Sequence, residues 1–215
     1  FTVSDITTNN ASHWAELLNL TARMSGLTIN DPSNALGLTY AQWSGGSSLL
    51  ALLNGSNVSY ALSVSDVPAA EARTTSQNAI ITVSDTAANV GTNLDALQAV
   101  AGKISSISLS GGSTLTVSAG QITSDATALS KIASYSLNVT EGVSTANATS
   151  IAANTHVTSM VISDTAANVG ANLDALQAVA GKISSISLSS GSTLTVSAGQ
   201  ITSDATALSK IASYS

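Results

Sequence analysis

The chain has 215 residues, a net charge of −6, and a composition that is 44% hydrophobic but only 8% charged and 3% aromatic. This acidic balance lacks the basic patches that attract a polyanion, so we expect no nucleic-acid binding. No run of 18 apolar residues and no basic amphipathic stretch occurs, so we expect no membrane insertion by this segment.

The first third of the chain contains four strand-like runs. They begin near Phe1, Leu27, Tyr60 and Ala79. Residues 1–5 echo residues 81–85, and residues 60–66 echo residues 135–141. Because these runs recur later in the chain, we interpret residues 1–80 as a divergent copy of a repeating unit.

A helical pattern follows residues 81–85. Its apolar residues recur at helical spacing, namely Val90, Leu94, Leu97 and Ala101. Asp85, one residue before Thr86, is placed to cap the N-terminus of this helix. Gly102, and Gly181 at the same position in the later copy, suit the left-handed residue that often follows a helix.

Further patterns complete the unit. Residues 104–109 and 114–117 fit short strands. Ser118-Ala-Gly-Gln is a capping-box pattern ahead of a second helix. The apolar face of that helix comprises Ile122, Ala126, Leu129 and Ile132. Residues 135–139 and 157–162 fit strands on either side of a weaker helix at 144–153.

A long internal repeat is the strongest signal in the sequence. Fifty of the 52 residues from 85 to 136 recur in order from 164 to 215, an offset of 79 residues. The exceptions are Ala171 in place of Thr92 and Ser190 in place of Gly111. We therefore expect a divergent unit (residues 1–80), a full unit (81–159) and a partial unit (160–215), in one continuous array.

The repeat predicts the fold class. Strand–helix segments of about 20–33 residues are too short to bury their own apolar faces, so they must stack on one another. We predict an α/β solenoid with parallel strands on one side and helices on the other, similar in principle to leucine-rich repeats. The alternative is a series of tandem β-sandwiches, which the helical spacing of Val90, Leu94 and Leu97 disfavours.

An acidic residue follows many of the strand-like runs. These residues are Asp5, Asp66, Asp85, Glu141 and Asp164. Carboxylates stacked at regular spacing are weak candidates for a calcium site, since calcium takes six to eight oxygen ligands. The favoured interpretation is that each one caps a helix or joins a hydrogen-bonded ladder. We expect no other cofactor.

The divergent unit contains both tryptophans. Trp14, Tyr40 and Trp43 are weak candidates for binding, because exposed aromatic rings stack on sugars or anchor a protein partner. The favoured interpretation is that they fill the core or a junction.

Other polar residues predict no chemistry. Asp95, Lys103, Asp125 and Lys131 recur as Asp174, Lys182, Asp204 and Lys210, and we interpret them as solvated charges on helix faces. His13 and His156 have no metal-binding pattern around them. Neither a nucleophile elbow nor a phosphate-binding loop occurs, so we predict no enzyme activity.

The repeat resembles a known class of sequence. Val-Ser-Asp-Thr-Ala-Ala-Asn-Val at 83–90, followed by Asn-Leu-Asp-Ala-Leu-Gln at 93–98 and Lys-Ile-Ser-Ser-Ile at 103–107, resembles repeats of very large bacterial surface and extracellular proteins. Many of those resemble type I-secreted, haemolysin-type adhesins. The resemblance covers residues 81–215 and implies an extracellular stalk, adhesin or surface-layer segment.

The partners expected from this reading are further copies of the chain, neighbouring surface proteins or glycans. Two alternatives stay open. One is a glycan- or ice-binding surface module with flat Thr/Ser/Asn faces. The other is the non-catalytic part of a secreted enzyme.

Overall fold

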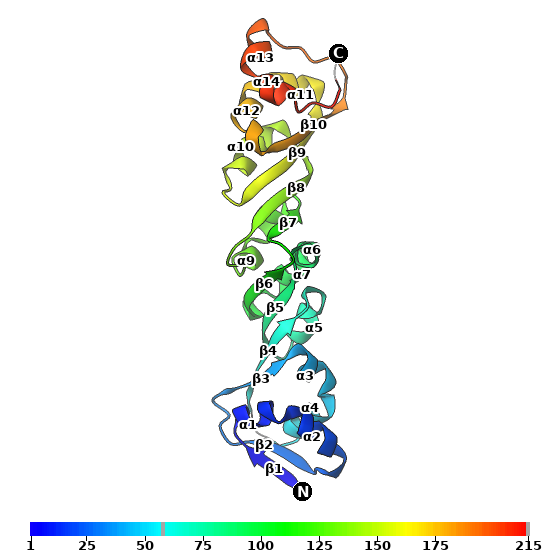
Figure 1. The fold of residues 1–215 in the computed structure, drawn as a ribbon, viewed down its shortest axis with the longest axis vertical. Coiled ribbons are helices and arrows are strands. Elements are labelled where there is room, and N and C mark those ends of the chain that lie inside the picture. The colour runs from blue at the N-terminus through cyan, green and yellow to red at the C-terminus, as the bar shows by residue number, and fades with distance from the viewer. Residues whose placement is uncertain (57–58, 214–215) are drawn as a thin grey trace. The chain divides into compact units, whose positions relative to one another are not determined.

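The computed structural model describes residues 1–56 and 59–213 (Figure 1). The chain has a mixed α/β fold with parallel strands in three sheets, which confirms the predicted α/β class. The strands are β1 (Thr2–Asp5), β2 (Gly26–Ile29), β3 (Ala35–Thr39), β4 (Ala61–Val67), β5 (Ile80–Thr86), β6 (Ile104–Ser110), β7 (Thr114–Val117), β8 (Ser136–Val143), β9 (Val157–Thr165) and β10 (Ile183–Ser190). The structure does not confirm the alternative of tandem β-sandwiches.

Short helices connect most of the strands. The α-helices are α1 (Thr7–Ser12), α2 (Trp14–Leu20), α3 (Tyr40–Gly45), α4 (Ser47–Asn54), α5 (Ala72–Thr75), α6 (Ala87–Thr92), α7 (Leu94–Ala99), α8 (Gln121–Ser124), α9 (Ala126–Leu129), α10 (Thr145–Ala153), α11 (Ala166–Ala171), α12 (Leu173–Ala178), α13 (Ala198–Ser203) and α14 (Ala205–Leu208). The described residues also contain four 3₁₀ turns, each between an α-helix and a strand: η1 (Thr21–Arg23), η2 (Ala69–Glu71), η3 (Ala101–Lys103) and η4 (Ala180–Lys182).

The chain forms two compact units. The first comprises Phe1–Ser110 and Thr127–Ala133, and it contains the sheets β1-β2 and β3-β4-β5-β6. The second comprises Gly111–Ala126 and Ser134–Ser215, and it contains the sheet β10-β9-β8-β7. In both four-stranded sheets each strand pairs with the next one along the chain, and all the pairs are parallel.

The alternation of side chains along the strands explains the core of each unit. Leu36 and Leu38 of β3 and Ile81 and Val83 of β5 are buried, and the residues between them are more exposed. Successive side chains of a strand point to opposite faces, so one face of the sheet supplies the core. Helices α1 and α3 pack against β3, and helices α5 and α6 pack against β5.

The helix predicted after residue 85 is broken into three pieces. Helices α6 and α7 and the turn η3 replace one continuous helix, and the first break is at Asn93 (φ −103°, ψ 15°). The Asn93 side chain donates to the carbonyl oxygen of Asn89, 2.9 Å away. Asparagine competes with helical hydrogen bonding in this way. The predicted core positions Val90, Leu94 and Leu97 are nevertheless fully buried.

Two predictions about the ends of this helix are wrong. Gly102 and Gly181 lie within 3₁₀ turns, and the described glycines with positive φ are Gly111, Gly112 and Gly191. Thr86, and not Asp85, occupies the N-cap, where its side chain accepts a hydrogen bond from the Asn89 N–H.

The second predicted helix keeps its cap but loses its continuity. Ser118 and Gln121 exchange the two hydrogen bonds of a capping box, as predicted. The helix is then interrupted at Asp125, between α8 and α9. As a result Leu129 and Ile132 are buried, whereas Ala126 is exposed, contrary to the predicted apolar face.

Candidate functional site

Three of the five candidate acidic residues share one local geometry. Oδ1 of Asp5, Asp85 and Asp164 accepts the N–H of the next residue at 2.8 Å in each case. The same oxygen accepts the side-chain amide of the asparagine four positions on, at 2.7–2.9 Å. Each of these carboxylates therefore stabilises the turn that leads from its strand into the following helix.

The second oxygen of two of these carboxylates reaches back to an earlier helix. Asp85 Oδ2 accepts the N–H of Ala69, the first residue of η2, at 2.9 Å. Asp164 Oδ2 accepts the N–H and the Oγ1 hydroxyl of Thr145, the first residue of α10, at 3.0 and 2.8 Å. These side chains satisfy helix donors that have no partner within the helix.

Asp31 makes the same kind of contact, although the sequence analysis did not identify it. Its carboxylate accepts the N–H and the hydroxyl of Thr7, the first residue of α1, at 2.6 and 3.0 Å. Its position shortly after β2 is the signal that could have found it. We call Asp31, Asp85 and Asp164 the tie carboxylates, because each one joins the segment after its strand to the start of a preceding helix.

Hydrogen bonding shifts the acidity of the tie carboxylates. The Asn168 side chain, together with Thr145 and Thr165, lowers the pKa of Asp164 to about 2. Partial burial raises the pKa of Asp85, but the hydrogen bonds from Ala69, Asn89 and Thr86 outweigh it and hold the pKa below its usual value. These carboxylates therefore remain charged at neutral pH.

The other two acidic candidates lie at irregularities in strands. Asp66 has a left-handed conformation (φ 58°) where β4 shifts register against β5, and Ser65 Oγ donates to its Oδ2. Glu141 is exposed where β8 shifts register against β9. The neighbouring Gly142 lies so close to Ser163 that an added Cβ would be 2.4 Å from the serine Cβ.

The structure does not gather the candidate calcium ligands into one site. Within residues 1–56 and 59–213, no group of three or more Asp, Glu, His or Cys side chains could hold a metal ion. The oxygens of the tie carboxylates are approached by N–H and O–H donors, which a bound cation would have to displace.

The three aromatic candidates have different environments. Trp14 is 0% exposed, and its Nε1 donates to the carbonyl oxygen of Gln42 at 2.9 Å. Gly46 makes room for this ring, since a Cβ there would lie 2.6 Å from Trp14 Nε1. Trp14 therefore fills the core of the first unit. Tyr40 and Trp43 are half-buried neighbours on α3, with ring centroids 6.0 Å apart.

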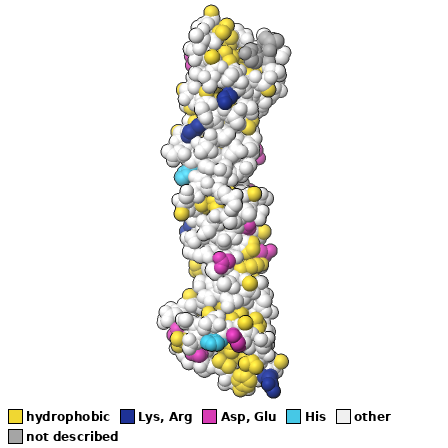
Figure 2. Space-filling view, viewed as in Figure 1, with side chains coloured by type: hydrophobic (Ala, Val, Ile, Leu, Met, Phe, Trp, Pro, Cys, Tyr) yellow, Lys and Arg dark blue, Asp and Glu magenta, His cyan; other side chains and the backbone are white. Residues whose placement is uncertain are grey.

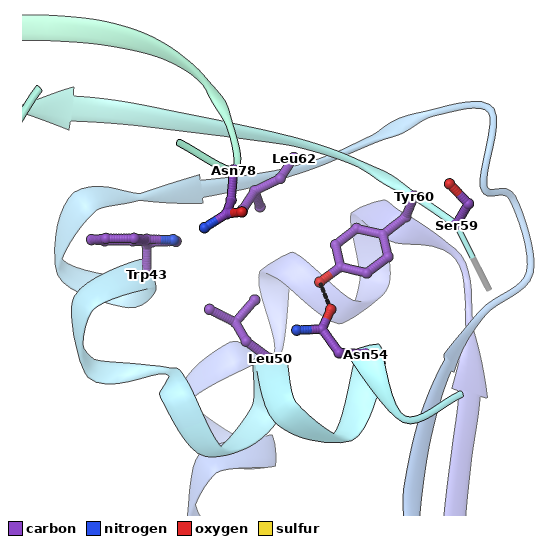
Figure 3. Close-up of a pocket in the computed structure, with 7 residues that line it drawn as sticks. All are labelled: Trp43, Leu50, Asn54, Ser59, Tyr60, Leu62 and Asn78. Carbon is purple, nitrogen blue, oxygen red and sulfur yellow. Dashed lines mark hydrogen bonds between the residues drawn. The ribbon is translucent and has the colours of Figure 1, made fainter. Parts of the chain in front are cut away.

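Trp43 also lines an open cleft of about 440 Å³ in the first unit (Figure 3). Its lining residues come from α3, α4, β4, and the segments just before β4 and β5: Trp43, Leu50, Asn54, Ser59, Tyr60, Leu62 and Asn78. The Tyr60 hydroxyl donates to Asn54 Oδ1 at 3.2 Å, and the Asn78 amide points between the two rings. Burial raises the pKa of Tyr60. The cleft thus combines two aromatic rings with neutral hydrogen-bonding groups.

The prediction of solvated helix-face charges is wrong for two aspartates. Asp125 and Asp204 are each only 3% exposed. Lys182 is also engaged, because its Nζ donates to the carbonyl oxygens of Ala152 and Asn154 at the end of α10, at 2.7 and 3.1 Å. A positive charge at a helix C-terminus is favourable.

The histidines have local contacts. His156 stacks on Tyr135, with ring centroids 4.0 Å apart and an interplanar angle of 4°. Its Nδ1 lies 3.0 Å from the Tyr135 carbonyl oxygen. His13 Nδ1 lies 3.1 Å from the carbonyl oxygen of Asn9. Each histidine ring therefore has a structural contact with its neighbours.

The surface is dominated by neutral atoms. On the face shown in Figure 2, charged side chains are sparse among backbone and hydroxyl or amide groups. None of the helices in the described part of the chain is long and apolar enough to cross a bilayer. Comparison with known proteins finds no matching family model, no matching curated protein and no matching solved structure.

Proposed function

We propose that this chain is a structural and adhesive repeat segment of a large extracellular bacterial surface protein, with no catalysis of its own. The observation that carries this proposal is the use of the repeated polar residues. Asp85, Asp164 and their asparagine partners are engaged in joining neighbouring strand–helix segments. These carboxylates recur in the copies of the repeat, and their oxygens already accept hydrogen bonds from the protein. This arrangement favours a role in holding strand–helix segments together over a role in catalysis.

The geometry supports a solenoid as the architecture. Successive strands of each four-stranded sheet are neighbours in chain order and parallel, and helical segments connect most of them. Each added strand–helix segment can therefore bury its apolar face against the one before it. The two nearly identical copies suit a part whose length is set by copy number.

A length series tests the solenoid. Chains carrying one, two or three additional copies of residues 81–159 should lengthen linearly in X-ray scattering. Each copy contributes three strand–helix segments, because the described residues between β6 and β7 contain no helix. At a strand spacing of roughly 4.8 Å, three segments predict about 14 Å for each added copy. Separate beads on flexible linkers would instead give a length that grows less than linearly.

Location and calcium dependence have their own tests. The absence of cysteine, the neutral surface and the resemblance to adhesin repeats support the extracellular assignment. Antibodies against the chain should label intact cells of the source organism.

Calcium is not required by the geometry, so we expect EDTA to leave the melting temperature unchanged. A fall of several degrees that calcium restores would contradict this expectation.

Glycan binding is the second candidate function, and the cleft of the first unit favours it. Aromatic faces pack against the apolar faces of sugars, and the amides of Asn54 and Asn78 can hydrogen-bond to sugar hydroxyls. Oligosaccharide binding should quench the fluorescence of Trp43 and leave buried Trp14 unaffected. In calorimetric titration, which does not depend on the fluorophore, Trp43→Ala should abolish this binding, whereas Tyr40→Phe, outside the cleft, should preserve it.

A separate assay distinguishes ice binding from the scaffold role and from glycan binding. An ice-recrystallisation assay on the intact chain should be negative if the stacked strands serve only as a scaffold. Inhibition of recrystallisation would instead favour the flat Thr/Ser faces as the binding surface.

A further inference from the structure

Two carboxyl groups meet on the helical side of the second unit. Asp174 is an exposed residue of α12, whereas Asp204, between α13 and α14, is 3% exposed. The two carboxyl groups are close enough for each to shift the pKa of the other. Gln200 Nε2 donates to Asp174 Oδ1 at 2.9 Å, and Ser203 Oγ donates to Asp204 Oδ1 at 3.0 Å.

The second oxygen of Asp204 is unusual. Oδ2 is buried, and no N–H or O–H group of the described residues donates to it when both carboxyls are ionised. A buried charge without such donors is costly. Two carboxylates can only accept hydrogen bonds, so a hydrogen bond between them requires one proton. The neutral acid form of Asp204 supplies that proton.

No positive charge on the surrounding helices offsets a second negative one. Helix α12 packs against α10, α13 and α14. Apart from Asp174 on α12 and Asp204 before α14, these four helices contain no titratable side chain. A calcium ion would need six to eight oxygens around it. Because Asp204 is buried, a proton is better placed than a larger cation to neutralise its carboxylate.

We propose that Asp174 and Asp204 form a carboxylic acid–carboxylate pair that binds one proton and fastens α12 to the junction of α13 and α14. Loss of this proton as the pH rises places two negative charges side by side and loosens the contact. The pair thus makes this segment of the repeat sensitive to pH, a property beyond the scaffold role.

The acidities of the two groups support this arrangement. Burial, together with the adjacent Asp174, raises the pKa of Asp204. The hydrogen bonds from Gln200 and from Asp204 itself lower the pKa of Asp174. A raised folded-state pKa stabilises the fold at low pH, and that contribution is lost as the pH rises through it. At a pH between the lowered pKa of Asp174 and the raised pKa of Asp204, the pair therefore holds one proton.

The same residues occur in the first copy of the repeat. Asp95, Gln121, Ser124 and Asp125 stand at the matching positions, 79 residues earlier. Asp125 is also 3% exposed, and Ser124 Oγ donates to its Oδ1 at 3.0 Å, as Ser203 does to Asp204. A long array of copies like residues 81–159 would carry the same four residues once in each copy.

Thermal melts of the full chain between pH 4 and pH 8 test the pair. Asp204→Asn replaces the acid with an amide that donates a hydrogen bond to Asp174 at every pH. We expect the melting temperature of this variant to exceed that of the wild type at pH 8 by on the order of a few °C, with the gap shrinking toward pH 4. Glu141→Gln, which removes one exposed charge, should keep the pH dependence of the wild type.

Asp174→Asn provides a second route if Asp204→Asn fails to fold. It removes the exposed member of the pair and should also reduce the loss of stability at high pH. Parallel pH profiles for the wild type and both variants would overturn the proposal. So would a rise in the wild-type melting temperature with 5 mM calcium that is absent from the Asp204 variant, because the pair would then be a cation site.

Discussion

The two copies of the 52-residue repeat are nearly identical in sequence but differ most in one strand, and α13 also begins two residues earlier in its copy than α8 does. Helices α6 and α7 and the turn η3 recur as α11, α12 and η4 with the same bounds, shifted by 79 residues. Residues 114–117 form β7, which pairs with Ser136–Val139 of β8. Residues 193–196 have the same sequence, Thr-Leu-Thr-Val, but form no strand.

The difference shows that the helices of the unit are specified locally, whereas the strand depends on a neighbour. A four-residue segment gains little from its own β-propensity, and most of its stability comes from pairing.

The largest expected effect is at the leucine in the middle of this segment. Leu115 is 0% exposed and pairs with Leu137, whereas Leu194 is 9% exposed and lies outside any strand. Leu115→Ala should lower the free energy of unfolding by about 2–5 kcal/mol, and Leu194→Ala by clearly less. Urea denaturation measures both. Equal losses would show that both segments pack equally well without regard to pairing.

A glycine in the second copy is expected to have the next largest effect. A Cβ at Gly170 would lie 2.8 Å from the backbone oxygen of Thr195, so the backbone would have to move. Gly170→Ala should cost about 1–3 kcal/mol in urea denaturation. Gly181→Ala is the matched control, because a Cβ there meets nothing within 4 Å.

The same substitution at Gly91 extends the test to the first copy. A similar cost would show that the first copy makes the same close approach to its Thr-Leu-Thr-Val segment. A neutral result at Gly170 itself would contradict the packing described above.

A smaller effect is expected from the tie carboxylates at acid pH. The pKa of Asp164 is lowered to about 2, so its contribution is present above its usual pKa of 3.8 and is lost as the pH falls from there toward 2. Asp164→Asn should therefore flatten the fall in melting temperature between pH 5 and pH 2. Asp85→Asn should do so less, because Asp85 accepts one hydrogen bond from the earlier helix where Asp164 accepts two. The reverse order would contradict this ranking.

The smallest effect is expected where the copies differ in sequence. Thr92 is exposed, and its hydroxyl donates to the Ala88 carbonyl oxygen at 2.9 Å. Thr92→Ala gives the first copy the residue of the second and should change stability by less than about 0.5 kcal/mol. A larger loss would show that the hydroxyl has a role that α11 lacks.

The sequence predicted the periodic parts of the fold well. The core residues Val90, Leu94 and Leu97, the Ser118–Gln121 capping box and most strands could be identified, because each rests on a local pattern. Strand β3 escaped prediction. Its residues Ala-Leu-Gly-Leu-Thr alternate over only a few positions and follow a turn rich in polar residues.

The rest could not be predicted because it depends on contacts distant in sequence. Nothing local distinguishes Asp204, which is buried beneath α12, from an ordinary solvated aspartate. Asp31 looks like a loop residue until Thr7, 24 positions earlier, is placed beside it. The cleft at Trp43 likewise draws Asn78 and Tyr60 from separate segments.

Lys182 provides a chemical means of distinguishing the copies. It and Lys103 lie in the same Ala-Gly-Lys-Ile-Ser sequence, but the Lys182 ammonium is held by the two carbonyl oxygens at the end of α10, whereas Lys103 is exposed. An acylating reagent that attacks free amines should therefore modify Lys103 before Lys182. Peptide mass spectrometry would measure the rate of acylation at each lysine. The slower rate at Lys182 would report how often η4 separates from the end of α10 in solution.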